Sequence, residues 1–207
     1  MKNIMKVAGL GALLVCAAAG GSIGKEETLD VSGVTEFEAP TIMPAVSVKG
    51  KSSSLQGHAT VERETDGLLL EHIEMWAPVK TLGTGMAVRD EHMRKLVFTT
   101  ADGQAPDLRF ESEKAVCSLR GGQEFACQLA GSLSIRGISR PFAVSLKVKQ
   151  AGGSAFKASG EAIVKLSEYE IVPPTQFGVK ISNEVKLRLE LVSKQRPVES
   201  ANGGGRH

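Results

Sequence analysis

The chain has 207 residues, of which 42% are hydrophobic and 23% charged, with 25 Lys and Arg against 23 Asp and Glu. A chain of this length and composition can bury a core as a single globular domain, which excludes disorder for most of it. The near-neutral charge, without a basic stripe, and the low count of nine aromatic residues (seven Phe, one Trp, one Tyr) exclude a typical nucleic-acid-binding surface.

The first 24 residues have the pattern of a secretory signal peptide. Two lysines precede an apolar run that ends at Ala19, and this run is too short to span a membrane. We expect cleavage after Ala19 or after Gly24, which places the mature protein in the periplasm. Cys16 follows "LLV", so anchoring as a lipoprotein through Cys16 is the less favoured alternative.

Residues 25–196 form one predicted domain in which apolar and polar residues alternate with a period of two. This alternation is typical of half-buried strands. It is clearest in the segments 55–62, 125–135, 142–148, 156–166 and 185–191. Turn signals such as "TDG", "RGGQ" and "AGG" separate the segments. Many alternating strands joined by short turns predict an all-β fold, either an antiparallel sandwich or a closed barrel.

Small residues recur on the apolar faces of these strands and bear on the choice between sandwich and barrel. They are Gly57, Ala59, Gly131, Ala158, Gly160 and Ala162. Small residues on an inner face leave room, which favours a barrel of about eight strands that holds one apolar ligand. The alternative is that they only accommodate bulky side chains on the opposite wall.

One segment, near residues 84–97, breaks the strand pattern and is predicted to be a short helix. Thr84 is a candidate N-cap, and Met86, Met93 and Val97 recur at helical spacing. Further along, the prolines of "VPP" before Thr175 fix an extended segment, which we interpret as leading into a loop across the barrel mouth.

Within the predicted helix, the run Arg89, Asp90, Glu91 and His92 contains residue types that build metal sites and acid–base pairs. A metal would need a second ligand one turn from His92, where the chain has Val88 and Leu96, so we predict neither a metal nor a cofactor. Our hypothesis is that Arg89 and Asp90 form an ion pair that holds the helix over one barrel end. His92 would be a packing or hydrogen-bonding partner.

After removal of the signal peptide, Cys117 and Cys127 remain, an even number in an exported chain. If Leu119 pairs with Phe125 around the "RGGQ" turn, Cys117 lies opposite Cys127, and by the same register Ala115 lies opposite Leu129. Directly opposed cysteines are close enough to bridge, so the register predicts a cross-strand disulfide.

Four segments resemble successive signature blocks of the YceI-like family and occur in the family's order. They are "TLGTGMAVRDEHM" (81–93), "LRFES" (108–112), "LAGSLSIRGISRPFAVSL" (129–146) and "VKISNEVKLRLEL" (179–191). The resemblance implies an extended, lipocalin-like antiparallel barrel, usually periplasmic, whose lumen holds a polyisoprenoid or another long amphiphile. The segment "KLSEYEIVPPTQFG" (165–178) departs from the family pattern, so the identity of the ligand does not transfer.

Together these observations predict binding, carriage or sequestration of a long apolar molecule, without catalysis. The alternative is an enzyme or redox accessory that acts on an isoprenoid or quinone-like substrate. Membrane contact would be transient, and the sequence leaves open whether a homodimer forms. Residues 197–207 are Gly-rich and polar, as in a disordered tail. From the apolar phase of the strands, the predicted lumen lining is Phe110, Leu129, Leu133, Phe142, Val144, Ala158 and Ala162.

Overall fold

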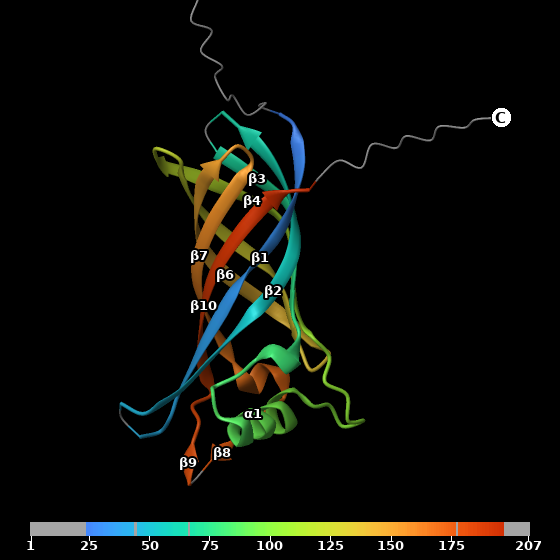
Figure 1. Cartoon of the computed structure of the whole chain (residues 1–207), viewed down its shortest axis with the longest axis vertical. Coiled ribbons are helices and arrows are strands. Elements are labelled where there is room, and N and C mark those ends of the chain that lie inside the picture. Colours follow the sequence, from blue (N-terminus) through green and yellow to red (C-terminus); the bar gives the residue numbers. More distant parts are fainter. Residues whose placement is uncertain (1–23, 44, 66, 177, 197–207) are drawn as a thin grey trace, which may run out of the picture.

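Eight antiparallel strands form a closed barrel (Figure 1). The computed structural model describes residues 24–43, 45–65, 67–176 and 178–196, so the expected signal peptide up to residue 23 and the expected tail lie outside the described residues. Strands adjacent in the chain pair with each other, and β1 also pairs with β10 to close the barrel. The strands are β1 (Glu26–Pro40), β2 (Ser47–Glu64), β3 (Gly67–Ala77), β4 (Leu108–Gly121), β5 (Glu124–Ile135), β6 (Ile138–Gly152), β7 (Ala155–Lys165) and β10 (Glu184–Gln195).

The alternation in the sequence corresponds to the inside and the outside of this barrel. In β2, for example, Leu55, Ala59 and Val61 are buried, whereas Gln56 between them is exposed. The pairing of β1 with β10 closes the sheet, so each of the eight strands has a paired neighbour on both sides. The predicted all-β, lipocalin-like barrel of about eight strands with one short helix is confirmed.

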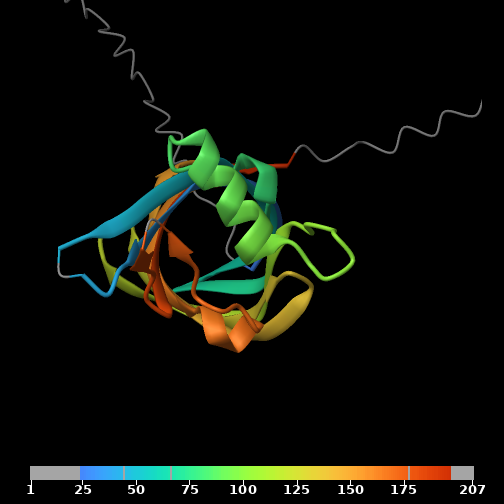
Figure 2. The same ribbon diagram turned by 90° about the horizontal axis from the view of Figure 1, so that it is seen from below.

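The predicted helix is present but begins later than expected. α1 spans Ala87–Met93 and continues through one wider π-helical turn, η2 (Arg94–Phe98). The prediction that Thr84 is the N-cap is wrong, because Met86 precedes the first helical residue and no side chain caps the helix there. α1 lies across part of the lower end of the barrel, as the view from below shows (Figure 2).

Other short elements gather at the same end, which we call the mouth. They are η1 (Val79–Thr81), η3 (Leu166–Tyr169) and the two-stranded ribbon of β8 (Thr175–Gln176) and β9 (Val179–Lys180). The extended segment that contains Pro173 and Pro174 connects η3 to β8. Its position at the mouth agrees with the interpretation drawn from the "VPP" sequence.

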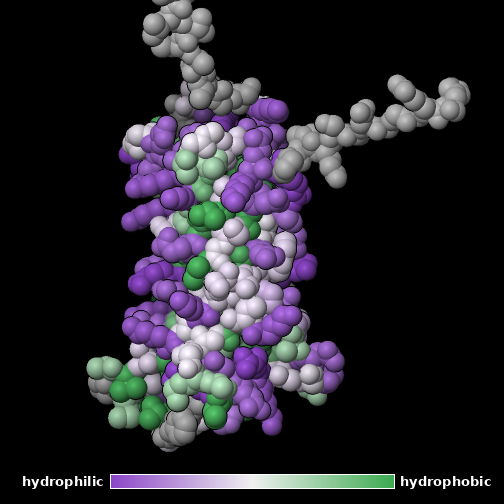
Figure 3. Space-filling model, in the orientation of Figure 1, coloured by the Kyte–Doolittle hydropathy of each residue, from purple (hydrophilic) through white to green (hydrophobic). Residues whose placement is uncertain are grey.

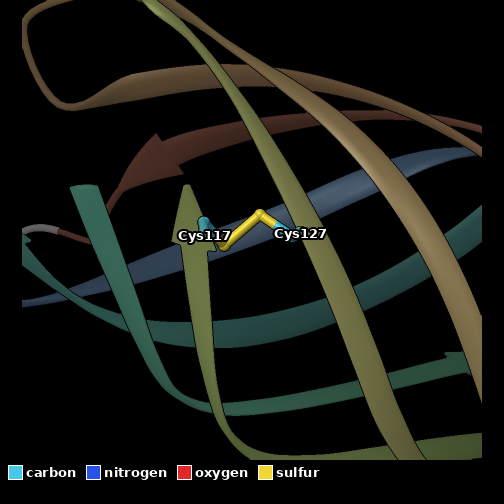
Figure 4. Close-up of a disulfide and its surroundings, with 2 residues drawn as sticks. All are labelled: Cys117 and Cys127. Carbon is cyan, nitrogen blue, oxygen red and sulfur yellow. A yellow bond between two sulfur atoms is a disulfide. The ribbon is translucent and has the colours of Figure 1, made fainter. Parts of the chain in front are cut away.

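A disulfide joins neighbouring strands near the opposite end, which we call the far end (Figure 4). Cys117 of β4 lies opposite Cys127 of β5, with an S–S distance of 2.05 Å and a Cα–Cα distance of 4.2 Å. The predicted bridge and the pairing of Leu119 with Phe125 are confirmed.

The register predicted beyond the disulfide is wrong. Ser112 pairs with Gly131, so the register shifts by one residue between Ser112 and Cys117, and Ala115 is not paired with Leu129. Glu113 and Lys114 are both exposed between buried neighbours, as a β-bulge requires. A turn sequence sets the register next to the hairpin but does not reveal a bulge several residues away.

The buried apolar residues fall into two clusters, one in each half of the barrel. The far half is built around the disulfide and Leu129, and Arg63 crosses its end by donating to the Gly153 carbonyl at 3.0 Å, above the ring of Phe156. The mouth half joins strand residues to residues of the short helices. Its buried core consists of Val79, Leu82, Phe98, Leu133, Ile135, Val164, Leu166, Tyr169 and Ile171.

The outer wall of the barrel is mostly polar, whereas apolar groups gather at the mouth (Figure 3). Ion pairs join neighbouring strands along the wall, including Lys149 to Glu124 and Arg109 to Glu74, each at 2.9 Å. In the β1–β2 loop, Ile42 and Met43 are exposed. Among the described residues, every helix is too short to cross a membrane.

Candidate ligand-binding site

An apolar cavity of 170 Å³ lies in the mouth half of the barrel. Its wall comes from inward-facing strand residues such as Phe37 of β1, Leu133 of β5 and Leu187 of β10. These residues face inward because side chains alternate between the two sides of a strand. Along the same strands, the other inward-facing residues form the core of the far half. The lining is almost wholly apolar, so the cavity suits a hydrocarbon group.

Helical residues cover part of the cavity from the mouth side. Met93 and Val97, four positions apart on α1 and η2, pack against the mouth cluster, and Phe98 is buried in it. This spacing puts successive apolar side chains on one helix face. Leu96 and His92 line the cavity but are exposed, which places them at its rim. The helix therefore closes the cavity without sealing it.

Polar residues also border the cavity, and Thr84, Arg89 and His92 do so beside the helix. Arg89 Nε donates to Thr84 Oγ1 at 2.7 Å, and a second guanidinium nitrogen donates to the Thr84 carbonyl at 3.0 Å. The Thr84 backbone N–H and hydroxyl both donate to Asp90 Oδ1, at 2.7 and 2.5 Å. These four bonds tie α1 to the loop that precedes it.

This network corrects the predicted ion pair of Arg89 and Asp90. The two side chains do not contact each other as a salt bridge; Thr84 lies between them and binds both. Arg94 adds a longer bond of 3.4 Å to the Leu82 carbonyl. The sequence analysis assigned Thr84 to helix capping and therefore did not predict that it binds both Arg89 and Asp90. His92 is exposed, and its part in packing or hydrogen bonding stays a prediction.

Opposing influences act on the Asp90 carboxyl. Burial raises its pKa, but the two hydrogen bonds from Thr84 and the positive charges of Arg94 and Arg89 together lower the pKa below its usual 3.8. Asp90 is therefore charged at neutral pH, as an acceptor of two hydrogen bonds should be. A general acid would need the opposite shift, so the geometry supports an anchoring role.

Tyr169 of η3 is the most deeply buried large side chain of the mouth half, 1% exposed. Burial, and next the neighbouring charge of Glu168, raise the pKa of its hydroxyl to about 12. The hydroxyl has no hydrogen-bond partner within the described residues, and Tyr169 does not line the cavity. It is thus a protonated core residue that secures η3.

A second, smaller cavity of 60 Å³ lies in the far half. Its lining is apolar and includes the disulfide, Leu129 and Ala158. Phe110 and Phe142 lie between the two cavities and pack against both clusters, with ring centroids 6.0 Å apart and an interplanar angle of 77°. We call this layer, Phe110 and Phe142 with the inward positions beside them, the waist.

The predicted lumen lining is therefore divided. Leu133 lines the mouth cavity, whereas Leu129 and Ala158 line the far one. Phe110 and Phe142 lie at the waist, partly buried, and line neither cavity. For the remaining two predicted residues, Val144 is 4% exposed in the core, and Ala162 packs beside the far cluster and lines neither cavity.

The small residues on the inner face did not all leave room. A side chain at Gly57 would collide with the sulfur of Met75, 2.4 Å from the Cβ position, and one at Gly160 would collide with a Leu146 methyl group at the same distance. At Gly131 the backbone of β4 occupies the space. At these three positions the alternative interpretation holds, in which small residues accommodate their neighbours.

The residues that close the mouth cavity were not assigned to it from the sequence. They include Met93, Val97 and Phe98 of the helical segment and Ile171 and Pro174 of the segment before β8. The four-residue spacing of Met93 and Val97 indicated an apolar helix face, and this was the sequence feature that could have placed the helix against the cavity. Among the described residues no group of three or more His, Cys, Asp or Glu side chains could hold a metal ion.

A closed eight-stranded barrel with an apolar cavity at one end defines a lipocalin-like class of protein. The chain belongs to the YceI-like family, because the YceI-like domain matches residues 27–193. No curated protein matches the chain.

Several solved structures share the fold. A polyisoprenoid-binding domain from Saccharophagus degradans has a TM-score of 0.62 and 16% identity, covering 83% of this chain and all of that one. BcnA from Burkholderia cenocepacia has a TM-score of 0.54 and 16% identity, covering 77% of this chain and 96% of that one. The YceI protein of Campylobacter jejuni has a TM-score of 0.56 and 16% identity, covering 94% of this chain and all of that one.

Proposed function

We propose that this protein binds the apolar chain of an amphiphile in the mouth cavity and carries or sequesters it, without catalysis. The observation that carries the proposal is an apolar cavity of 170 Å³ bordered at its rim by Thr84, Arg89 and His92. Such a site holds a hydrocarbon group inside and leaves a polar head group at the rim, within reach of a guanidinium donor. The fold shared with a polyisoprenoid-binding domain supports an isoprenoid chain.

The periplasm is the proposed location. The first 24 residues support it by their signal-peptide pattern, and the Cys117–Cys127 disulfide supports it because such bonds persist in oxidising compartments. A carrier there would meet its ligand at a membrane surface only during loading and release.

Extraction of the native protein tests the function. The protein is purified from its own host under mild conditions, and bound compounds are extracted with solvent and identified by mass spectrometry. An unrelated exported protein, prepared in parallel, serves as the control. We expect a chain-bearing amphiphile in stoichiometric amount. Repeated extraction that yields nothing above the control contradicts the proposal.

The same preparation separates a carrier from the alternative, an enzyme or redox accessory that acts on an isoprenoid or quinone-like compound. The identified compound is returned to the purified protein, and its amount and oxidation state are followed. A carrier returns the compound unchanged. Conversion beyond one equivalent per protein would establish the enzyme instead.

A further inference from the structure

Resting on the function proposed above, we further propose that the bound chain ends at the waist. Affinity then rises with chain length only up to about ten to fifteen carbons, the length that the mouth cavity holds, and longer chains gain nothing more. The far half is a packed core that supports the cavity and does not take part in binding.

The two cavities are separate, because they share no lining residue. On β5, Gly131 is the single inward position between Leu129 of the far cavity and Leu133 of the mouth cavity. β1 and β10 have the same arrangement, with Gly33 and Leu189 at the corresponding positions. One layer of inward side chains therefore divides the lumen, and the far-cavity residue and the mouth-cavity residue of each strand are about 13 Å apart.

Two aromatic rings, both partly buried, lie in this layer. Phe142 of β6 is paired with Gly131, and Phe110 of β4 is paired with Leu133, so the two rings come from the strands on either side of β5. Gly131 has no side chain between them, and the rings meet edge to face with their centroids 6.0 Å apart. Val144, 4% exposed, packs in the same cluster. A chain longer than the mouth cavity would have to displace both rings.

The volumes set the length of chain that fits. At about 15 Å³ for each water-sized group, a cavity of 170 Å³ has space for roughly eleven such groups, and one of 60 Å³ for roughly four. A methylene group is of similar size, so the mouth cavity holds about two isoprene units, and a third extends toward the rim. A long polyisoprenoid would leave most of its length outside.

A series of isoprenoid alcohols tests this on the wild-type protein. Geraniol, farnesol and geranylgeraniol have ten, fifteen and twenty carbons, and their dissociation constants are measured by titration below their aggregation limits. Each buried methylene raises affinity by up to roughly fourfold. We expect a steep gain from geraniol to farnesol and none from farnesol to geranylgeraniol. A further gain of about tenfold or more at the last step would show that the waist opens and would overturn the proposal.

Two variants sharpen the result. Phe110→Leu with Phe142→Leu removes both rings while keeping the layer apolar, and it should raise affinity for geranylgeraniol about tenfold with little effect on farnesol. Ala158→Leu fills the far cavity and should leave all three affinities unchanged. Loss of geranylgeraniol binding in Ala158→Leu would overturn the proposal even if the double variant does not fold. Failure of all three alcohols to bind the wild type would instead contradict the proposed function.

Discussion

The far half and the mouth half of the barrel are built from the same strands and the same alternation, yet the far half keeps a cavity of only 60 Å³ and the mouth half one of 170 Å³. Far-half residues such as Leu129 and Cys117 are 2% and 1% exposed, whereas the mouth-half residues Val185 and Leu187 are only partly buried. In the far half, side chains from opposite walls and a disulfide close the interior. In the mouth half, helices and loops close it and leave a cavity. We therefore expect the far half to contribute more to stability and the mouth half to hold the proposed ligand.

The largest expected difference between the halves is the cost of truncating a core leucine. Leu129→Ala in the far half should lower the free energy of unfolding by about 3–5 kcal/mol, because Leu129 is 2% exposed and borders only the small far cavity, so truncation loses both burial and packing. Leu133→Ala, four residues along the same strand, should cost about 2 kcal/mol because Leu133 is more exposed, at 8%, and borders the larger mouth cavity. Urea denaturation measures both. An equal or larger cost at Leu133 would remove the distinction between the halves.

The disulfide should matter for stability and not for binding. Replacing both Cys117 and Cys127 with alanine should lower the free energy of unfolding by about 2–3 kcal/mol, the value for a short closed loop. Farnesol affinity should stay unchanged, since the bond lines the far cavity and not the mouth cavity. Reducing agent should destabilise the wild type similarly and have no effect on the double variant. A binding defect in the folded double variant would show that the two halves are coupled.

The polar network at the mouth should have a smaller, local effect. Thr84→Val removes the hydroxyl that donates to Asp90 and accepts from Arg89, at an expected cost of about 1 kcal/mol. Hydrogen exchange should become faster in α1, with the far-half strands unchanged. Thr28→Val, at an exposed position of β1, is the matched control and should change neither. Faster exchange throughout the barrel would mean that the network is not local.

The smallest expected effect is the pH dependence of this network. Because the folded-state pKa of Asp90 is lowered below 3.8, its contribution to stability is full above that pH and is lost as pH falls through the folded-state pKa. Wild type should therefore be more stable than Asp90→Asn at pH 7, and the difference in melting temperature should shrink below pH 4. A difference that stays constant or widens in acid would contradict the charged, hydrogen-bonded state of Asp90.

The sequence predicted the fold well because its signals are local. Alternation, turn residues and the hairpin register around Cys117 and Cys127 depend on neighbouring residues, and each led to a correct element. The bulge between Ser112 and Cys117 was missed because nothing in the turn fixes the register that far away.

The candidate site was harder to predict because a cavity depends on volumes from distant segments. Alternation shows that Leu129 and Leu133 both face inward, but not that the first borders a small cavity of 60 Å³ and the second one of 170 Å³. The small residue Gly57 suggested open space on the inner face, yet Met75 occupies the space beside it. Packing between strands determines whether an inward position borders a cavity or a side chain, and this packing cannot be inferred from a single sequence.

A matched pair of valines tests the central claim most directly. Val185 of β10 lines the mouth cavity and Val148 of β6 lines the far cavity, so Val185→Phe and Val148→Phe add the same bulk to each. Both should destabilise the fold by about 1–3 kcal/mol, the usual cost of overpacking. Farnesol titration of the folded variants should show binding weakened by about tenfold or more in Val185→Phe, through displaced methylenes, and unchanged binding in Val148→Phe. Equal losses in both, or a loss confined to Val148→Phe, would contradict the division of the barrel into a binding half and a supporting half.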